Sequence, residues 1–203
     1  MGQVAATLER TLKEFLREKP ALFWTIAWPI LWVLIGSFSF TTGAPSHVVP
    51  SLRASITISM AVFSLMIAGM ANLPSSIAED RERGLLSKLI SMPVKPWRDS
   101  LGRILGLLSF STIAVALVLL AGYLCGARFT ATIPETFGAL AFLLQASLAS
   151  AGIGMIIGAL IKRVHGAVMT GVGISVVTAA LSGMMAPYSS LPEILKAFAR
   201  AYP

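Results

Sequence analysis

Side chains able to make strong polar interactions are concentrated in residues 75–103, between two long apolar runs. This stretch carries ten charges, six basic and four acidic. Each charge at the centre of a bilayer costs about 3 kcal/mol, so ten would cost on the order of 30 kcal/mol. We therefore expect the stretch to lie in water, where its charges are available for recognising a partner.

The front half of this stretch is predicted to form a helix. Ser76 and Glu79 have the S-x-x-E spacing of a capping box, and acidic residues follow in the first turns, where they suit the helix dipole. Apolar residues then recur at helical spacing, and Pro93 ends the helix. Such a helix suits docking onto another protein; a solvated loop that only links two spans is the alternative. The predicted docking residues are Glu79, Glu82, Arg83, Gly84, Leu85, Leu86, Leu89 and Ile90.

No motif for catalysis or metal binding accompanies these charges. His47 and His165 are isolated, and Cys125 lies in an apolar run without a disulfide partner. The sequence has no H-E-x-x-H motif, no paired intramembrane carboxylates and no phosphate-binding loop. We therefore expect no catalytic residue, no metal site and no cofactor in this chain. If ATP drives the protein, ATP and Mg²⁺ belong to another subunit.

Composition indicates a membrane protein. The 203 residues are 56% hydrophobic and 12% charged, about half the charge of a soluble domain, and the mean hydropathy is +0.80. Five apolar runs reach about the twenty residues that a bilayer demands. They predict an all-α polytopic membrane protein with a single transmembrane domain over residues 1–203. The predicted spans are residues 21–41, 54–73, 104–126, 137–161 and 166–186.

The distribution of basic residues predicts the orientation. With the N-terminus inside, the inner segments hold twelve Lys and Arg residues and the outer segments hold four. This excess follows the positive-inside rule, and it predicts a cytoplasmic N-terminus in the cell (plasma) membrane. The charged stretch then faces the cytoplasm. The pI near 10.1 reflects this topology, and we expect no nucleic-acid partner.

The two ends of the chain are also patterned. Residues 1–20 place apolar positions on one helical face and charges on the others, which predicts an interfacial helix before the first span. Residues 187–203 repeat apolar side chains at helical spacing after Pro192, and we expect a short re-entrant helix in the outer leaflet. Because the sequence stops in the middle of this pattern, we expect a sixth span beyond residue 203.

Small and polar residues inside the spans have two interpretations. G-x-x-x-G spacings at 102–106, 122–126 and 154–158 indicate close helix packing. Uncharged polar side chains could line a solute path, and hydrogen bonding between helices is an equal alternative. No charged residue lies deep within a span, although ion-coupled carriers usually need one. The possible path residues are Ser55, Ser59, Gln145, Ser175, Thr178 and Ser182.

The charged stretch resembles the permease subunits of type-2 ABC (ATP-binding cassette) exporters. Residues 79–94, with the sequence EDRERGLLSKLISMPV, are similar to that family's charged run, glycine, leucine-rich helix and Pro-Val pair. Leu101-Gly102-Arg103 is similar to its later glycine–basic pair, and the layout of the flanking helices is also similar. The chain departs from the family's usual Thr-Leu-Glu after the glycine, because Leu85-Leu86-Ser87 stands there.

The resemblance implies a half-transporter. Residues 75–100 would be the cytoplasmic coupling segment, with a coupling helix over residues 79–92 seated in a groove of a separate ATPase subunit. Two permeases, identical or different, would join two ATPases, and ATP-driven closure would move a substrate outward. The apolar spans favour a lipophilic substrate, either a drug or a lipid, and polysaccharide is the alternative because polysaccharide exporters share the same layout. A secondary carrier and a membrane scaffold that recruits a cytoplasmic partner are the alternatives.

Overall fold

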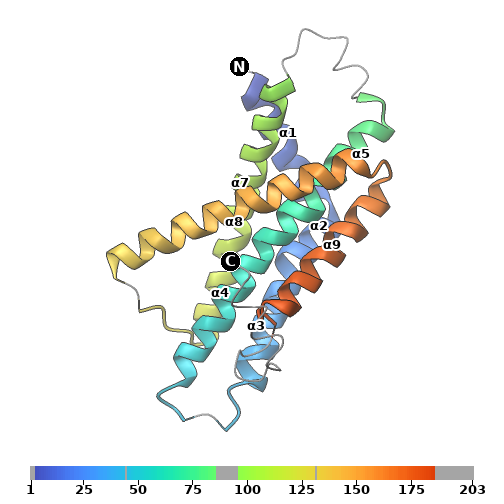
Figure 1. Ribbon diagram of the computed structural model, residues 1–203. Helices are drawn as coiled ribbons and strands as arrows, with labels where there is room; N and C mark the ends of the chain where they lie inside the picture. The colour runs from blue at the N-terminus through green and yellow to red at the C-terminus, as the bar shows by residue number, and fades with distance from the viewer. Residues whose placement is uncertain (1–2, 44, 86–95, 131, 186–203) are drawn as a thin grey trace.

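The computed structural model describes residues 3–43, 45–85, 96–130 and 132–185, and within these ranges it contains helices and no strand (Figure 1). The first part of the chain forms helix α1 and then a nearly continuous rod. Its elements are α1 (Gln3–Arg17), α2 (Lys19–Leu22), the π-helix η1 (Phe23–Ala27) and α3 (Trp28–Ser39).

The second rod lies at the centre of the molecule, and three more helices surround it. The rod consists of α4 (Val49–Ile67), the π-helix η2 (Ala68–Asn72) and α5 (Leu73–Glu82). Then follow α7 (Pro96–Leu124), α8 (Ile133–Leu160) and α9 (Val164–Leu181). In Figure 1, α8 crosses the central rod and α9 runs beside it.

Five of these helical rods are long and apolar enough to cross a membrane, which confirms the predicted all-α polytopic fold. They cover Lys19–Ser39, Val49–Glu82, Trp97–Leu124, Ile133–Leu160 and Val164–Leu181. The second is the longest, at 34 residues, and 78% of its apolar window is buried, against 39% or less in the other four. The second span is therefore the core against which the others pack.

The capping box predicted at Ser76 and Glu79 is wrong. Apolar residues before Ser76 continue the helix without a break, so Ser76 lies inside α5 with only 1% of its surface exposed. The predicted single helix over residues 79–92 is also wrong, because α5 ends at Glu82. Gly84 follows with φ of +69°, a conformation that glycine adopts without strain. Leu86, Leu89 and Ile90 lie outside the described residues.

The expectation that all ten charges of residues 75–103 lie in water is wrong for two of them. Asp80 is fully buried and Arg103 is 6% exposed, and the two side chains form an ion pair. Burial is tolerated here because each charge is neutralised by a partner within the protein. Two of the ten charges therefore lie inside the fold and pair with each other there.

Helix α1 is confirmed, and its apolar face packs against protein. The rings of Phe15 and Phe110 on α7 lie 5.4 Å apart, and Phe15 is fully buried. Thr7 and Thr11 pack where Gly102 and Gly106 leave room on α7. The position of α1 relative to the bilayer stays a prediction. The predicted outer-leaflet helix, residues 187–203, lies outside the described residues.

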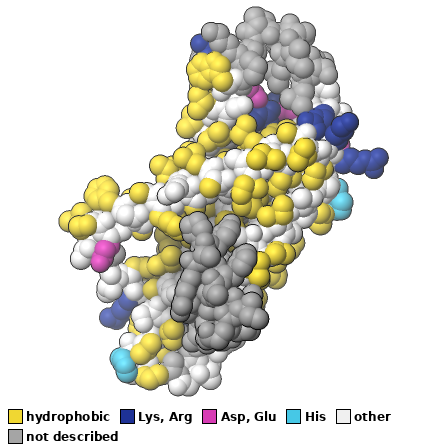
Figure 2. Space-filling model, in the orientation of Figure 1, with side chains coloured by type: hydrophobic (Ala, Val, Ile, Leu, Met, Phe, Trp, Pro, Cys, Tyr) yellow, Lys and Arg dark blue, Asp and Glu magenta, His cyan; other side chains and the backbone are white. Residues whose placement is uncertain are grey.

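Charged and apolar side chains are separated along the molecule. Figure 2 shows hydrophobic side chains along α8 and Lys and Arg side chains gathered where α5 ends and α8 turns into α9. The tryptophans of the first span, Trp24, Trp28 and Trp32, pack against the buried cluster formed by the first, second, third and fifth spans. They therefore pack helices together.

Candidate functional site

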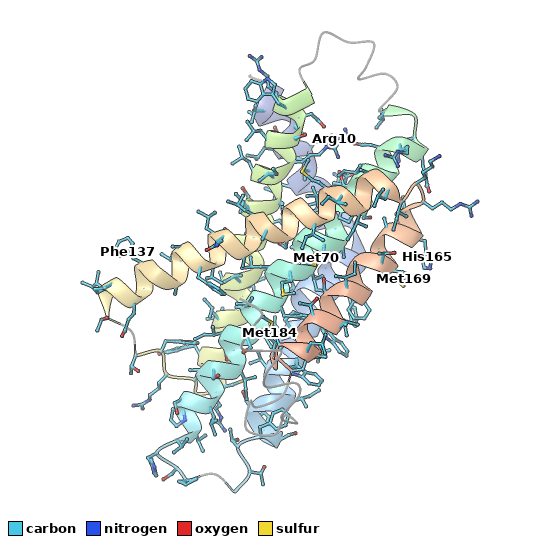
Figure 3. All side chains as sticks on the ribbon, in the orientation of Figure 1. Arg10, Met70, Phe137, His165, Met169 and Met184 are labelled. Carbon is cyan, nitrogen blue, oxygen red and sulfur yellow. The ribbon has the colours of Figure 1, made fainter. Side chains whose placement is uncertain are left out.

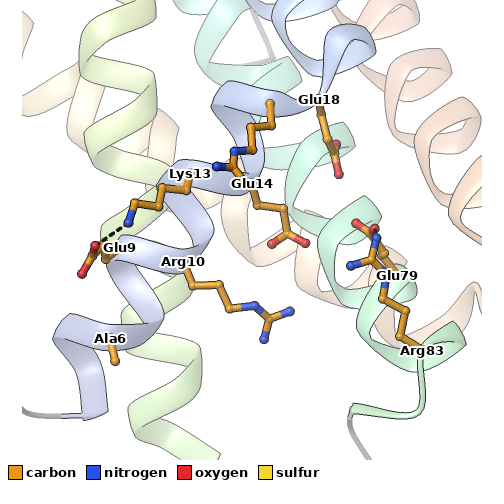
Figure 4. Close-up of a pocket in the computed structure, with 9 residues that line it drawn as sticks. Ala6, Glu9, Arg10, Lys13, Glu14, Glu18, Glu79 and Arg83 are labelled. Atoms are coloured by element: carbon orange, nitrogen blue, oxygen red, sulfur yellow. Dashed lines mark hydrogen bonds and ion pairs between the residues drawn. The ribbon is translucent and has the colours of Figure 1, made fainter.

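Most of the charged side chains with long-range contacts converge on the end of α5. This end is where α1, the start of α7 and the turn between α8 and α9 meet (Figure 1). It also leads into residues 86–95, the rest of the predicted coupling segment. Figure 4 shows Arg10 and Glu14 extending from α1 toward α5.

The buried carboxylate of Asp80 joins three helices. Its Oδ1 accepts from Arg10 on α1, and its Oδ2 accepts from Arg103 on α7. Arg103 also donates to Asp99 Oδ2 at 2.8 Å and to Ser76 Oγ at 3.2 Å. We call these five residues, together with Glu14, the Asp80 network. Because its members come from α1, α5 and α7, the network holds these helices in one arrangement.

The two ion pairs of Asp80 differ in strength. The Arg103 side chain is 7% exposed, whereas the Arg10 side chain is 43% exposed. Removing one partner of a buried pair costs about 3–5 kcal/mol, whereas an exposed pair contributes about 1 kcal/mol or less. The pair between α5 and α7 is therefore the stronger link, and the pair to α1 is the one that solvent can weaken.

Glu14 of the Asp80 network also belongs to a group of three carboxylates. The oxygens of Glu14, Glu18 and Glu79 lie within 4.8 Å of one another. Burial, a hydrogen bond with Glu79 and repulsion from Glu79 and Glu14 raise the pKa of Glu18 to about 7, although Arg83 opposes this shift. Burial also raises the pKa of Glu14, while the hydrogen bond from Ser76 opposes it. The group therefore retains a proton near neutral pH.

This acidic group is the one place among the described residues where three side chains could supply ligands to a metal ion. Acidic groups of this kind are common without a metal. The sequence prediction of no metal site did not consider it, because Glu18 and Glu79 belong to different helices and meet only in the fold.

The last turn of α5 also binds the turn between α8 and α9. Glu82 Oε1 accepts from the backbone N–H of Val164 at 3.1 Å. Arg81 donates to the backbone carbonyls of Ile161 and Ala159 at 3.5 and 3.4 Å. Polar contacts therefore fix the end of α5 on three sides.

Two cavities flank this end of α5. The first, of about 610 Å³, lies between α1 and α5 (Figure 4). The second, of about 800 Å³, lies between α2 and η1 on one side and the start of α9 on the other, and η2 and α5 form its floor. Glu18, Glu79 and Arg83 line both cavities. The second also has an apolar wall that includes Trp24, Val168 and Met169.

The structure brings together only part of the predicted docking surface. Glu79 forms an ion pair with Arg83, and Glu82 holds the α8–α9 turn, so all three side chains have partners within the chain. Gly84 has open space around it, and Leu85 is partly buried. Contact of these residues with another protein stays a prediction.

The predicted path residues have different surroundings. Ser175 is buried and donates to Gly171 O at 2.8 Å and to Met70 Sδ at 3.5 Å. Thr178 and Ser182 donate to carbonyls of their own helical segment, and Ser55 and Gln145 are exposed. None of the six, Ser59 included, lines either cavity described above. A path that involves them stays a prediction.

Sequence reasoning missed the contribution of α1 to this site. Arg10, Glu14 and Glu18 are spaced four residues apart, so they form one stripe on the helix, and the structure directs this stripe toward α5. The spacing was visible in the sequence. The partners were not, because Asp80 lies 70 positions after Arg10.

Comparison with known protein families gives one match. A family model described as ABC-2 type transporter matches residues 2–203, nearly the whole chain. A search of curated proteins finds no match.

Proposed function

Because this chain belongs to the ABC-2 type transporter family, we propose that it exports its substrate and that residues 75–100 couple export to ATP hydrolysis. The chain is a multi-pass membrane protein and a transporter permease subunit, and its family works with an ATP-binding cassette subunit. Membership in this family sets aside the carrier and scaffold alternatives. The ATPase activity belongs to the partner.

The observation that carries the coupling proposal is the position of α5. This helix continues the most buried span of the protein and ends where the predicted coupling segment begins. Its end is bound to α1 and α7 by ion pairs and to the α8–α9 turn by hydrogen bonds. A force applied to residues 83–95 by an ATPase subunit would therefore move several spans together.

The proposed orientation agrees with the fold. Segments predicted to be inside, namely α1, the end of α5, the start of α7 and the α8–α9 turn, lie at one end of the molecule, and the α3–α4 connection lies at the other (Figure 1). We place the first end in the cytoplasm and the chain in the cell membrane. The excess of basic residues supports this placement.

The proposed substrate is lipophilic, and the proposed complex contains two permease copies. The 800 Å³ cavity has an apolar wall beside a charged rim, which suits an amphipathic molecule. None of the six possible path residues lines either described cavity, which agrees with a path formed by two copies, either identical or different. Inverted membrane vesicles test the direction: a fluorescent lipophilic dye should accumulate inside them only with ATP.

A substitution at Gly84 tests the proposal that residues 75–100 couple the permease to the ATPase subunit. The tagged chain is co-expressed with the ATP-binding cassette subunit of the same organism and purified in detergent. Gly84→Val forces a β-branched residue to φ of +69°, where such residues are outliers, and should redirect the chain that follows α5. We expect a normal yield of folded permease with little bound ATPase subunit.

Gly43→Val is the matched control. Gly43 has φ of +83° and also has open space around it, but it lies between α3 and α4, at the opposite end of the molecule. This variant should retain the ATPase subunit. Equal retention by the wild type and both variants would contradict the proposed coupling role of residues 75–100.

A further inference from the structure

The first two spans carry the same kind of helix interruption. In η1 the N–H of Trp28 donates to Phe23 O, and in η2 the N–H of Leu73 donates to Ala68 O, five residues back instead of four. A proline follows directly in each case, Pro29 and Pro74. Proline has no N–H, so the carbonyls four residues before it, on Thr25 and Met70, lose their usual donor. The sequence thus explains both interruptions.

The two interruptions are joined by buried hydrogen bonds. Ser64 Oγ on α4 donates to the freed carbonyl of Thr25 at 2.6 Å, and Asn72 Nδ2 donates to Thr25 Oγ1 at 2.8 Å. Thr25 and Ser64 are fully buried, and Asn72 is 4% exposed. The Ser64 hydroxyl therefore replaces a bond that the first span has lost, and the bond from Asn72 to Thr25 places η1 and η2 side by side.

Helices α8 and α9 meet η2 through glycine. A side-chain carbon at Gly154 would overlap Gly69 O, and one at Gly171 would overlap Met70 O. Met70 lies where the central rod crosses α8 (Figure 3). At these two positions α8 and α9 present backbone to η2, so no side chain of Gly154 or Gly171 stands in the way of a change in its angle, although Ser150 and Ser175 contact η2 through their side chains.

The segments on either side of η2 are held by different means. On one side, ion pairs fix α5 to α1 and α7. On the other, Met60, Phe63 and Ile67 of α4 pack in an apolar cluster with Val33 of α3. Bends in helices occur at prolines and at π-helical segments, and π-helical segments are frequent at functional sites. The joint between the two segments is where the central rod can bend.

We propose that η1 and η2 form one paired hinge, at which α5 turns together with α1, α2 and the start of α7 relative to α3 and α4. The hydrogen bonds of Thr25 make the two spans bend together. The hinge rests on the proposed function only for the source of the motion, which is ATP hydrolysis by the partner subunit. The contacts that define the hinge lie within this chain.

Hydrogen–deuterium exchange of the purified chain in detergent tests the hinge without an ATPase. Amides in residues 22–28 and 68–76 should exchange several-fold faster than those of the flanking helices.

Pro74→Ala restores a donor for Met70 O and should slow exchange in both segments. In a background with Asn72→Leu, the same substitution should slow exchange in residues 68–76 only, because the link to Thr25 is then weakened. Pro50→Ala, in the first turn of α4, is the matched control and should change neither segment.

The driven motion is measured in the complex. Spin labels at Lys13 on α1 and Ile58 on α4, in a Cys125→Ala background, report the distance between the two sides of the hinge; both positions are exposed. The distance should shift between the nucleotide-free and the vanadate-trapped complex, and the shift should be lost in a Pro29→Ala/Pro74→Ala variant.

Two outcomes would overturn the hinge. One is uniform hydrogen exchange along both spans, and the other is a change in the spin-label distance that survives this double substitution. Failure of the wild-type chain to bind an ATPase subunit, with the exchange pattern intact, would contradict only the proposed function.

Discussion

Asp80 is a fully buried carboxylate shared by arginines from two other helices. Such a group contributes little net stability when all partners are present, because burying the charges costs about as much as pairing them returns. Its value lies in the arrangement that it specifies, since any other packing of α1, α5 and α7 leaves a charge unpaired. We therefore expect this residue to tolerate substitution poorly.

Asp80→Ala should lower the free energy of unfolding by up to about 3–5 kcal/mol, because the buried Arg103 loses one of its two carboxylate partners and Arg10 loses its partner on α5. Thermal unfolding of the purified protein in detergent, followed by tryptophan fluorescence, measures this. Glu9→Gln is the control, because Glu9 pairs with Lys13 on the exposed face of α1, and its loss should leave the unfolding temperature close to the wild-type value. Similar unfolding temperatures for the two variants would show that the Asp80 network is dispensable.

Glu18 makes stability depend on pH. Its pKa is raised from 4.5 to about 7, so the folded protein binds the proton more tightly than the unfolded chain does. This contribution is fully present below about pH 4.5 and is lost as the pH rises through 7. The groups that face Glu18 are Glu14, Glu79 and Arg83, and the raised pKa of Glu14 acts in the same direction.

Glu18→Gln should therefore reduce the fall in unfolding temperature between pH 5 and pH 8. The measurement is the difference between the two temperatures for the wild type and for the variant. Glu9→Gln should leave that difference close to the wild-type value, because Glu9 lies apart from the acidic group. An undiminished fall in Glu18→Gln would show that Glu18 is ionised throughout this range.

At the scale of elements, the contacts of α8 and α9 with η2 depend on the absence of side chains. Gly154 and Gly171 lie against backbone carbonyls of η2, whereas Gly152 and Gly173, two residues away on the same helices, have open space around them. The G-x-x-x-G spacing at 154–158 is thereby confirmed as a packing motif. Each helix therefore offers a packed glycine and an open glycine, and substituting the two measures how much the contact with η2 contributes to stability.

Gly171→Ala should destabilise the protein by about 1–3 kcal/mol, because the added methyl group forces α9 away from η2. Gly173→Ala should be neutral or stabilising by about 0.5–1 kcal/mol, since alanine is the better helix former. Chemical unfolding in detergent compares the two variants. Equal effects would mean that α9 can move from η2 without cost.

At the scale of the whole molecule, the central rod defines an axis, and the charged network lies at one end of it. The Asp80 network, both cavities and the α8–α9 turn belong to one end, and the connection between α3 and α4 belongs to the other. The proposal that the first end is cytoplasmic concerns the orientation of this axis in the membrane.

Cysteine labelling of intact cells tests that orientation. In a Cys125→Ala background, a cysteine at Ser51 should react with a membrane-impermeant thiol reagent, whereas one at Lys162 should react only after the cells are opened. Both positions are exposed. The reverse pattern would place the Asp80 network outside the cell and contradict the proposed coupling to a cytoplasmic ATPase.

Local properties of the sequence determined the five spans, the excess of basic residues in one set of connections and the position of the charged stretch. Whether a segment enters the membrane depends on its own hydropathy and charge, because the segment contacts lipid or water directly. The prolines and glycines of η1, η2, α8 and α9 were equally visible, but their partners were not.

Only the tertiary structure decided which residues meet. Arg10 and Asp80 are 70 positions apart, and Thr25 and Asn72 are 47 apart. Ser76 illustrates the difference: its spacing to Glu79 suits a helix cap, yet the buried apolar residues before it continue the helix and its hydroxyl binds α1 and α7. A local pattern predicts a local interaction, and packing between distant segments overrides it when the packed arrangement has the lower free energy.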